Sequence, residues 1–301
     1  MQSTAVTVRV PATSANLGAG FDCLGLALDL FASITVTFSP CEVLPTEDVG
    51  EKMVITAVRQ AYLRLGKTPP PGIRAHYTVS IPLGRGLGAS AVARVAGVLA
   101  ANEYEGRPLD SDTCLTVASD LEGHGDNAAP AMFGGMQVCV AKDGRYVHTS
   151  CAYPADAAMA ILIPDQSMAT KEARKALPDT YSRADAVHNI GRAALFVAAM
   201  ASGRRDLLDE ATDDVIHQRQ RATLFPPMFD VFAAAKGAGA YAAWLSGAGS
   251  SIAAICPEPI ARDAAAAMLD CLRNAGLTGR TLVTRIAAQG AQVARIELVE
   301  E

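Results

Sequence analysis

The sequence predicts an α+β fold in two domains, with helices and strands mixed along the chain. Its 301 residues allow about two domains, which can bury about three quarters of the surface of the unfolded chain. Half of the residues are hydrophobic and 19% are charged, which excludes general disorder. No linker rich in proline, serine or charge divides the chain. The pattern of elements changes after Pro154, which places the first domain at residues 1–154 and the second at residues 155–301.

Periodic apolar residues predict the elements of the first half in order. Strands are expected at residues 5–10, 34–38, 73–81 and 136–141. Helices are expected at residues 52–65, 89–103 and 111–121. The third strand ends in β-branched residues, and the helix that follows it is rich in alanine and valine. Gly66 caps the first helix, ahead of a run of prolines.

The second half begins with a buried strand at residues 158–163. Helices are expected next at residues 171–176, 183–201 and 228–236. The remainder is expected to run strand, turn, strand, helix, strand, strand through residues 241, 252, 264, 282 and 293. This mixed order gives the α+β class.

Charge and cysteine content exclude several functional classes. The net charge of −5 leaves no basic field for nucleic acid or an anionic membrane, so any anion site has to be local. Seven cysteines without a C-x-x-C pair, and an N-terminus without a basic region and long apolar core, argue against secretion, disulfides and a zinc cluster. The most apolar stretches, residues 193–201 and 231–245, are too short or are interrupted by Lys236 and glycines. A cytoplasmic location without nucleic-acid or membrane partners is expected.

A glycine-rich stretch joins the strand predicted at residues 73–81 to the alanine-rich helix. Its glycines allow a tight turn that brings successive N–H groups close to an anion, and the start of the helix adds unpaired amides and its positive dipole end. These features are typical of a phosphate site, and Ser90 could place its hydroxyl on a metal. The expected phosphate-binding residues are Pro82, Leu83, Gly84, Arg85, Gly86, Leu87, Gly88, Ala89, Ser90 and Ala91.

Two other interpretations of this loop stand beside phosphate binding. Gly84, Gly86 and Ala89 fit the spacing of a dinucleotide fold, with Glu103 about 20 residues from the loop. That fit fails on context, because one helix alone separates the loop from Glu103 where a second strand is needed. A glycine turn that binds nothing is the simplest alternative for the loop taken alone.

Three motifs together resemble one enzyme family. Residues 11–28, P-A-T-S-A-N-L-G-A-G-F-D-C-L-G-L-A-L, closely resemble the N-terminal motif of homoserine kinases, which belong to the GHMP small-molecule kinases. Residues 82–91 match the second GHMP motif, P-x-x-x-G-L-G-S-S-A, except at Ala89. Residues 245–251 match the glycine-rich third motif, with Ser250 where a proline is common. The residues taken for this third motif are Ser246, Gly247 and Gly249.

The resemblance implies a fold and an activity. The fold is a two-domain GHMP kinase fold, with a left-handed βαβ unit in the N-terminal domain, a ferredoxin-like C-terminal domain and an active site between them. The activity is ATP-dependent phosphorylation of the hydroxyl of L-homoserine to O-phospho-L-homoserine, in threonine biosynthesis. Another GHMP kinase, acting on mevalonate or a sugar, is the nearest alternative. A catalytically silent nucleotide-binding protein is an alternative from another functional class. The presence of Ser90, Glu122 and Asn127 argues against it.

The polar loop at residues 121–130, L-E-G-H-G-D-N-A-A-P, resembles an E-G-H-x-D-N segment of homoserine kinases. The resemblance makes Glu122 and Ser90 the metal ligands, and oxygen ligands of this kind suit Mg²⁺. Mg²⁺ is therefore the expected cofactor and ATP the co-substrate. The residues with implied catalytic roles are Asn16, Asp22, Asp126 and Asn127. Asp126 either accepts the hydroxyl proton or binds only the substrate ammonium, and His124 is as readily a hydrogen-bonding residue of the loop as a catalytic one.

Homoserine carries an ammonium, a carboxylate and a hydroxyl. Its pocket therefore needs anionic groups for the ammonium, guanidinium groups for the carboxylate and precise positioning of the hydroxyl. Residues 168–174 resemble the family's S-T-x-x-A-R stretch, and residues 213–221 align with a segment ending in P-Y-R, which is R-Q-R here. Arg174 and Arg221 are thus the implied carboxylate ligands, and paired guanidinium forks suit a carboxylate. Without the resemblance, each arginine is expected to be a solvated charge on a helix.

The substrate-binding residues implied by the resemblance are Asn16, Asp22, His124, Asp126, Asn127, Thr170, Arg174 and Arg221. The expected partners are two small molecules, L-homoserine and ATP. A homodimer is a further expectation.

Overall fold

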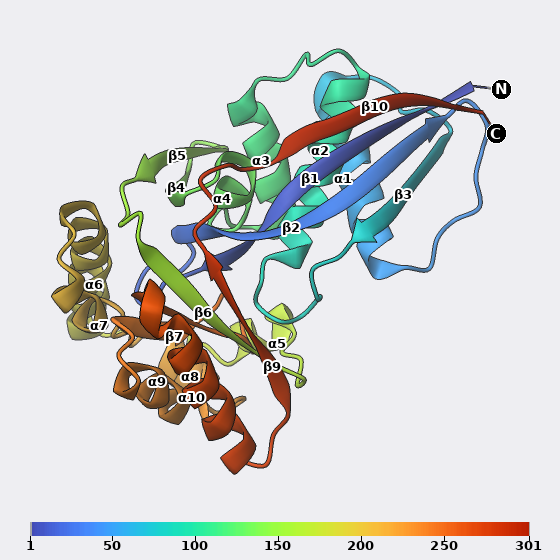
Figure 1. Ribbon diagram of the computed structural model, residues 1–301. Helices are drawn as coiled ribbons and strands as arrows, with labels where there is room; N and C mark the ends of the chain where they lie inside the picture. The colour runs from blue at the N-terminus through green and yellow to red at the C-terminus, as the bar shows by residue number, and fades with distance from the viewer. Residues whose placement is uncertain (1, 301) are drawn as a thin grey trace.

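The structure is a computed structural model that describes residues 2–300 (Figure 1). Two sheets with helices packed on them make up this part of the chain. The strands are β1 (Gln2–Ala15), β2 (Leu24–Ser39), β3 (Gly72–Val79), β4 (Met136–Lys142), β5 (Arg145–Cys151), β6 (Ala157–Pro164), β7 (Ala242–Leu245), β8 (Ile252–Pro257), β9 (Gly279–Arg285) and β10 (Gln292–Glu300). The α-helices are α1 (Val49–Leu65), α2 (Ala89–Tyr104), α3 (Ser111–Glu122), α4 (Ala128–Phe133), α5 (Thr170–Lys175), α6 (Arg183–Ser202), α7 (Leu208–Ala211), α8 (Gln218–Arg221), α9 (Met228–Gly237) and α10 (Ala261–Asn274).

The first sheet has the strand order β10–β1–β2–β4–β5, and β3 also pairs with β2. All of these pairings are antiparallel. Because β3 and β4 both run antiparallel to β2, they run parallel to each other, and α2, α3 and α4 connect them. This is a βαβ connection, as the family resemblance implied, and its left-handedness stays a prediction.

Apolar and polar side chains alternate along β1 and β2, and the helices pack on the apolar face of the first sheet. Val6, Val36 and Phe38 are buried and belong to the core that α1, α2 and α3 complete. Thr7 and Thr35 point to the other face, where their hydroxyl groups lie 2.8 Å apart and are half-buried. The period of two thus separates an apolar face from a polar one.

Local signals fix the ends of the helices that approach the site. Asp48 caps α1 and Asp110 caps α3, and each carboxylate accepts an amide hydrogen bond of 2.8 Å from the third residue after it. Gly66 and Gly123 end these helices in the left-handed region, with φ of 66° and 81°. The end of α3 at Gly123 therefore places Glu122 at the start of the polar loop.

The second sheet has the order β7–β8–β6–β9, with every pairing antiparallel. Along the chain its elements run β6, the helices α5 to α9, the β7–β8 pair, α10 and β9. This βαββαβ order with these neighbours is the ferredoxin-like arrangement that the resemblance implied. Residues of α9 and α10, such as Met228 and Met268, pack on one face of the sheet in a second buried cluster.

Strand β6 is buried on both faces and joins the two cores. Met159 and Ile161 belong to the first core, whereas Ala160 and Leu162 belong to the second. Its sequence is accordingly a continuous apolar run, which made this strand predictable without any alternation of polar residues.

The predicted division after residue 154 falls between β5 and β6, which belong to different sheets. This boundary stays a prediction. The C-terminal end of the second predicted domain differs from the structure. Residues 292–300 had been assigned to the second domain, but they form β10, which pairs with β1 in the first sheet. The chain thus returns to the first sheet after completing the second.

Several elements differ from the sequence-based expectations. β1 and β2 extend well beyond the predicted residues 5–10 and 34–38. The short helix α4 and the strand β5 had not been expected. β5 is half exposed, and among the strands of residues 2–300 it pairs with β4 alone at the sheet edge, so its apolar pattern is weak.

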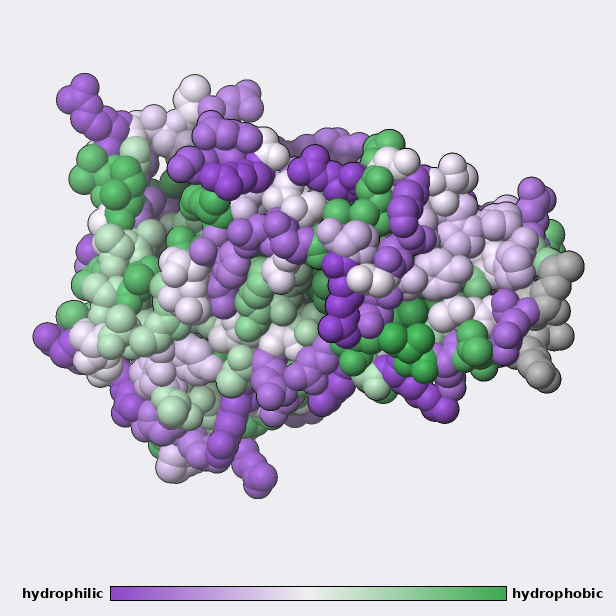
Figure 2. All heavy atoms as spheres, turned by 90° about the horizontal axis from the view of Figure 1, so that it is seen from above, coloured by the Kyte–Doolittle hydropathy of each residue, from purple (hydrophilic) through white to green (hydrophobic). Residues whose placement is uncertain are grey.

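The surface mixes hydrophilic and hydrophobic side chains. On the face shown in Figure 2, hydrophobic atoms form small patches among hydrophilic ones. None of the helices formed by residues 2–300 combines the length and the apolar character that a membrane span requires. No disulfide joins the seven cysteines, all of which lie within residues 2–300, and three of them, Cys114, Cys139 and Cys256, are buried.

Close contact between α1 and α2 makes a first prediction. A Cβ at Gly97 of α2 would lie 2.4 Å from the carbonyl oxygen of Val54 and 2.8 Å from the Cβ of Ala57, both in α1. Gly97→Ala should therefore force the two helices apart and lower the free energy of unfolding by about 1–3 kcal/mol in a urea titration. Gly191→Ala in α6 is the control, because its Cβ meets open space; it should raise stability by up to about 1 kcal/mol. Equal stabilities of the two variants would contradict this packing argument.

Candidate active site

A cleft of about 790 Å³ collects residues from both domains. Its lining comes from the segment between β1 and β2, the loop before α2, the loop after α3, the helices α5 and α8, and the turn after β7. Every site residue predicted from the sequence lines this cleft except Ser246. Segments far apart in the sequence therefore meet in one place.

The loop before α2 is built to approach an anion with its backbone. Gly84, Gly86 and Gly88 lie in the left-handed region, with φ of 66°, 72° and 69°. Gly88 is the N-cap of α2 and brings no side chain, so the first amides of the helix stay free to donate. A Cβ at Gly88 would lie 1.8 Å from the hydroxyl oxygen of Thr13. Both the turn and the space around it thus require glycine.

The glycine turn after β7 supports this loop from behind. Ser246 is fully buried and donates its hydroxyl hydrogen to the carbonyl of Gly86 at 2.7 Å. The amide of Ser251 donates to the carbonyl of Arg85 at 3.1 Å. A Cβ at Gly86 would lie 2.0 Å from the carbonyl oxygen of Ser246. Ser246 therefore contacts the loop rather than the cleft.

Ser90 and Glu122 meet where α2 begins and α3 ends. Ser90 donates its hydroxyl hydrogen to Oε1 of Glu122, and Arg94, one turn later in α2, forms an ion pair with the same oxygen at 2.9 Å. Burial lowers the pKa of Arg94, and the charge of Glu122 opposes that change. A hydroxyl and a carboxylate side by side are hard oxygen donors, which fit Mg²⁺.

Asp22 is held by hydrogen bonds in the segment between β1 and β2. It lies in the left-handed region at φ 57°, as does Asn16 at φ 70°, a conformation that is costly for residues other than glycine. The two guanidinium nitrogens of Arg174 in α5 donate to the two carboxylate oxygens of Asp22 at 2.8 and 3.0 Å. The amide of Asp22 donates to the side-chain oxygen of Asn16 at 3.0 Å. This two-pronged pairing orients Arg174 over the cleft.

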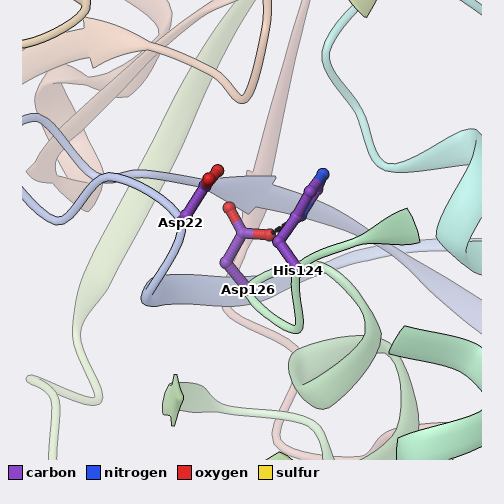
Figure 3. Close-up of side chains that lie close together, drawn as sticks. All are labelled: Asp22, His124 and Asp126. Atoms are coloured by element: carbon purple, nitrogen blue, oxygen red, sulfur yellow. Dashed lines mark hydrogen bonds and ion pairs between the residues drawn. The ribbon is translucent and has the colours of Figure 1, made fainter. Parts of the chain in front are cut away.

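Asp22, His124 and Asp126 converge on one point of the cleft (Figure 3). Their ligand atoms all lie within 4.8 Å of one another. Asp126 is 1% exposed, binds Nδ1 of His124 and accepts a hydrogen bond of 3.3 Å from Asn127. Burial by itself lowers the pKa of His124, but Asp126, with Asp22 and Glu122, outweighs burial and raises that pKa. The cluster favours a cationic group.

Arg221 of α8 is a buried cation at the other side of the cleft, with 2% of its surface exposed. Its Nη1 donates to the carbonyl of Gly247 at 3.0 Å and lies 3.2 Å from Nδ1 of His217, and its Nε donates to the carbonyl of Ala173 at 3.3 Å. Burial and the nearby Arg174 lower the pKa of Arg221 to about 10. The guanidinium therefore stays charged at neutral pH.

The ring of Phe21 contacts both arginines. The central guanidinium carbons of Arg174 and Arg221 lie 5.5 and 5.3 Å from its centroid. Two cations gathered on one ring, each with N–H groups near the cleft, form a site for an anion such as a carboxylate.

Sequence reasoning missed several cleft residues. Arg94, Lys171 and Lys175 line the cleft together with the residues that had been predicted. Arg94 could have been found from helical spacing, because it follows Ser90 by one turn and shares its face of α2. Lys171 and Lys175 share the short helix α5 with Arg174 and surround it with positive charge.

A second cavity of about 350 Å³ adjoins the loop before α2. Pro82, Leu83 and Ala89 line both cavities. The second one adds Tyr77 and Val92, so its wall is partly aromatic and apolar. A flat ring could enter it while its substituents reach the glycine loop.

Comparisons with known proteins agree with this geometry. Residues 52–135 match the family of GHMP kinases N terminal domains, and residues 192–275 match the family of GHMP kinases C terminal domains. The homoserine kinase of Deinococcus radiodurans is 42% identical to this chain, over 95% of this chain and 96% of its own. This chain belongs to the homoserine kinases of the GHMP family. The membership predicted from the three motifs is confirmed.

Solved structures of homoserine kinases share the fold of this chain. The enzyme from Cytophaga hutchinsonii superposes with a TM-score of 0.86 at 28% identity, covering 98% of this chain and 97% of that one. A putative homoserine kinase from Listeria monocytogenes gives 0.74 at 29% identity, over 98% and 100% of the two chains. The two-domain GHMP kinase fold is thus confirmed. The family consists of ATP-dependent kinases, so this chain uses ATP as its co-substrate.

The buried His217 beside Arg221 gives a prediction for pH. Burial and the charge of Arg221 lower the pKa of His217, against the opposing charge of Asp214. Nε2 of His217 lies 2.8 Å from the carbonyl of Gly18, so the neutral ring donates there and accepts from Arg221 at Nδ1.

Because the folded pKa is depressed, the contribution of His217 to stability is complete above its unfolded pKa of about 6.5 and is lost as pH falls below it. Urea titrations at pH 7.5, 6.0 and 5.0 should show a steeper loss of stability for the unmodified protein than for His217→Gln. A difference between the two proteins that stays constant with pH would contradict the assignment.

Proposed function

We propose that this chain transfers the γ-phosphate of ATP to the hydroxyl of L-homoserine, giving O-phospho-L-homoserine and ADP in threonine biosynthesis. The observation that carries the proposal is the placement of Arg174 and Arg221 around one ring, beside the acidic pair Asp22 and Asp126 and facing the glycine loop in one cleft. Similarity to homoserine kinases over nearly the whole chain supports the same substrate. Mevalonate and sugars lack the ammonium that the acidic pair would bind.

The nucleotide is assigned to the glycine loop and the adjoining cavity. Amides at Ala89, Ser90 and Ala91 start α2 and would donate to phosphate oxygens. The cavity beside Tyr77 would take the adenine ring, which places the triphosphate along the loop toward Ser90.

Ser90 and Glu122 would hold Mg²⁺ when the nucleotide binds. The fit rests on their adjacent hard oxygen donors, and Arg94 holds the carboxylate in place in the absence of the ion. When bound, Mg²⁺ would neutralise charge on the β- and γ-phosphates. The triad Asp22, His124 and Asp126 is less suited to the ion, because one of its three ligands is a nitrogen of His124 and Mg²⁺ prefers oxygen.

Homoserine would lie between the acidic cluster and the arginines. Its ammonium would face Asp126 and Asp22, its carboxylate Arg221 and Arg174, and its hydroxyl the loop that carries Asn127. Thr170, the first residue of α5, lines the same end of the cleft, as does Asn16. Each charged group of the substrate thereby meets the opposite charge.

The transfer forms a bond between the homoserine oxygen and the γ-phosphorus and breaks the bond to the β-phosphate oxygen, which leaves on ADP. Little deprotonation of the alcohol is needed early, because the transition state of phosphoryl transfer is loose. Most of the catalysis therefore comes from two effects, the alignment of the two substrates and the stabilisation of phosphate charge by the loop amides. Asp126 lines the same cleft and would receive the proton as the bond forms.

A substrate panel tests the proposal directly. The purified protein is assayed with ATP and Mg²⁺ against L-homoserine, homoserine carboxamide, mevalonate and galactose, with ADP release as the readout. The kcat/KM should be highest for homoserine, and the carboxamide should be a poor substrate because the arginines lose their anion. Faster turnover of mevalonate or galactose would show that the substrate assignment is wrong.

The arginine pair gives the next prediction. Arg174→Ala and Arg221→Lys should each raise the KM for homoserine at least about tenfold and leave the KM for ATP nearly unchanged, since the two-pronged contact to the carboxylate is lost. Both variants should discriminate less between homoserine and its carboxamide. Arg64→Ala, at the exposed end of α1, is the control. An unchanged homoserine KM in Arg174→Ala would remove that residue from substrate binding.

Metal binding gives a separate prediction. Glu122→Gln keeps the shape of the side chain but removes its charge, so turnover should fall at least about tenfold and the Mg²⁺ concentration for half-maximal rate should rise. Asp120→Asn, two residues earlier and exposed on α3, is the matched control. If Glu122→Gln has the same turnover as the control at every Mg²⁺ concentration, Glu122 is not a ligand.

A further inference from the structure

Arg94 is a cation of the cleft to which the assignments above give no part of either substrate. It lies on α2 one turn after Ser90, and both side chains line the cleft beside the glycine loop. The side chain of Arg94 is 19% exposed, and that of its ion-pair partner Glu122 is 12% exposed. Taking a guanidinium this far out of water is costly unless an anion stays close to it. Arg94 therefore needs a negatively charged partner in every state of the cleft.

The contact between Arg94 and Glu122 is an ion pair without a directed hydrogen bond. Nη1 of Arg94 lies 2.9 Å from Oε1 of Glu122, yet this buried nitrogen forms no hydrogen bond within residues 2–300. Arg174, by contrast, donates two aligned hydrogen bonds to Asp22. A guanidinium carries five N–H groups and binds most strongly when two of them are donated in parallel to one anion. The donors of Arg94 are thus available to a second anion.

Ser90 and Arg94 contact the same oxygen of Glu122. The hydroxyl of Ser90 donates to Oε1, and Nη1 of Arg94 approaches that same atom. Ser90 and Glu122 are the two residues assigned to Mg²⁺, so a metal ion held by both would lie at this oxygen. Two cations at one carboxylate oxygen repel each other. Arg94 would therefore have to leave Oε1 when Mg²⁺ binds.

The polyphosphate of the nucleotide is the anion that a displaced Arg94 can reach. Among residues 2–300, the other two acidic residues that line the cleft, Asp22 and Asp126, already have cationic or imidazole partners of their own. Residues four apart share one face of a helix, so Arg94 lies on the same face of α2 as Ser90. The planar fork of a guanidinium matches two oxygens of a phosphate.

We propose that Arg94 binds the phosphates of the nucleotide, and that it exchanges Glu122 for them when Mg²⁺ binds. In the metal-free protein the ion pair stops the carboxylate from repelling an incoming polyphosphate. After the exchange the guanidinium stabilises negative charge on the transferring phosphate. The proposal rests on the assignment of the nucleotide to the loop before α2, but it does not depend on which alcohol accepts the phosphate.

Nucleotide binding without metal tests the phosphate contact, because Glu122→Gln neutralises the carboxylate and releases Arg94. Isothermal titration calorimetry in EDTA measures the Kd of AMPPNP, an ATP analogue that cannot transfer its γ-phosphate. Glu122→Gln should bind AMPPNP at least about fivefold more tightly than the unmodified protein does. The double variant Glu122→Gln/Arg94→Met should lose that gain, and Glu122→Gln/Arg94→Lys should keep part of it because the charge remains without the fork. The Kd of AMP, which lacks the outer phosphates, should be nearly the same in all of these proteins.

Metal binding to the nucleotide-free protein tests the exchange. Mn²⁺ takes the same oxygen ligands as Mg²⁺, and its free concentration can be read from its electron paramagnetic resonance signal. Arg94→Met should bind Mn²⁺ more tightly than the unmodified protein, because no cation then competes for Glu122. A residue that merely supported Glu122 as a ligand would have the opposite effect when removed. Binding that survives in Glu122→Gln/Arg94→Met lies elsewhere and is subtracted.

Arg59→Met, on an exposed part of α1 that lines neither cavity, is the matched control and should behave like the unmodified protein. Thermal midpoints show that each variant is folded, and the double variant removes both charges together, so it leaves neither unpaired. Equal AMPPNP affinities of Glu122→Gln and the double variant overturn the phosphate contact, and weaker Mn²⁺ binding by Arg94→Met overturns the exchange. If the unmodified protein with Mg²⁺ binds AMPPNP no more tightly than AMP, the assignment of the nucleotide to the loop fails instead.

Discussion

The carbonyl oxygen of Gly247 joins the parts of the cleft. It accepts hydrogen bonds from Asn16 at 2.8 Å and from Arg221 at 3.0 Å, while the amide of Gly247 donates to the carbonyl of Ala15 at 3.0 Å. One turn after β7 thus positions a residue of the first motif and a buried cation of the second domain. Loss of either contact would leave a buried polar group unpaired, at a cost of about 1–3 kcal/mol. The third motif therefore acts on the chemistry through its backbone.

The charges of the cleft are arranged in pairs that a ligand can exchange. Asp22 is bound to Arg174, and Glu122 to Arg94, in a protein whose net charge is only −5. Pairing offsets much of the cost of taking charged groups out of water. A zwitterion brings one charge of each sign, so it can bind between such groups without leaving either sign in excess. This favours an amino acid over a substrate with a carboxylate alone.

The sequence predicted which residues line the cleft. It did not predict how deeply Arg221 is buried or which strand pairs with β10. The glycine loop at residues 82–91 and the polar loop at residues 121–130 are each a contiguous motif, and all their predicted residues line the cleft. Arg221 looked like a surface charge without the family comparison, yet it is 2% exposed, because α8 is a single turn packed beneath Gly247. The pairing of β10 with β1 could not be predicted, because alternation indicates a strand but not its neighbour at the other end of the chain.

Strand β6 limits how the two domains can move. Met159 and Ile161 are buried in the first core and Ala160 and Leu162 in the second, so a hinge between the sheets would expose apolar surface at about 25 cal/mol per Å². The buried Trp244 adds a hydrogen bond of 3.1 Å to Ser14 across the same junction. The loop before α2 is tied to the same junction, because Ser246 donates to the carbonyl of Gly86 at 2.7 Å. The junction thus keeps the two halves of the cleft in a fixed relation, which suits a transfer that depends on alignment.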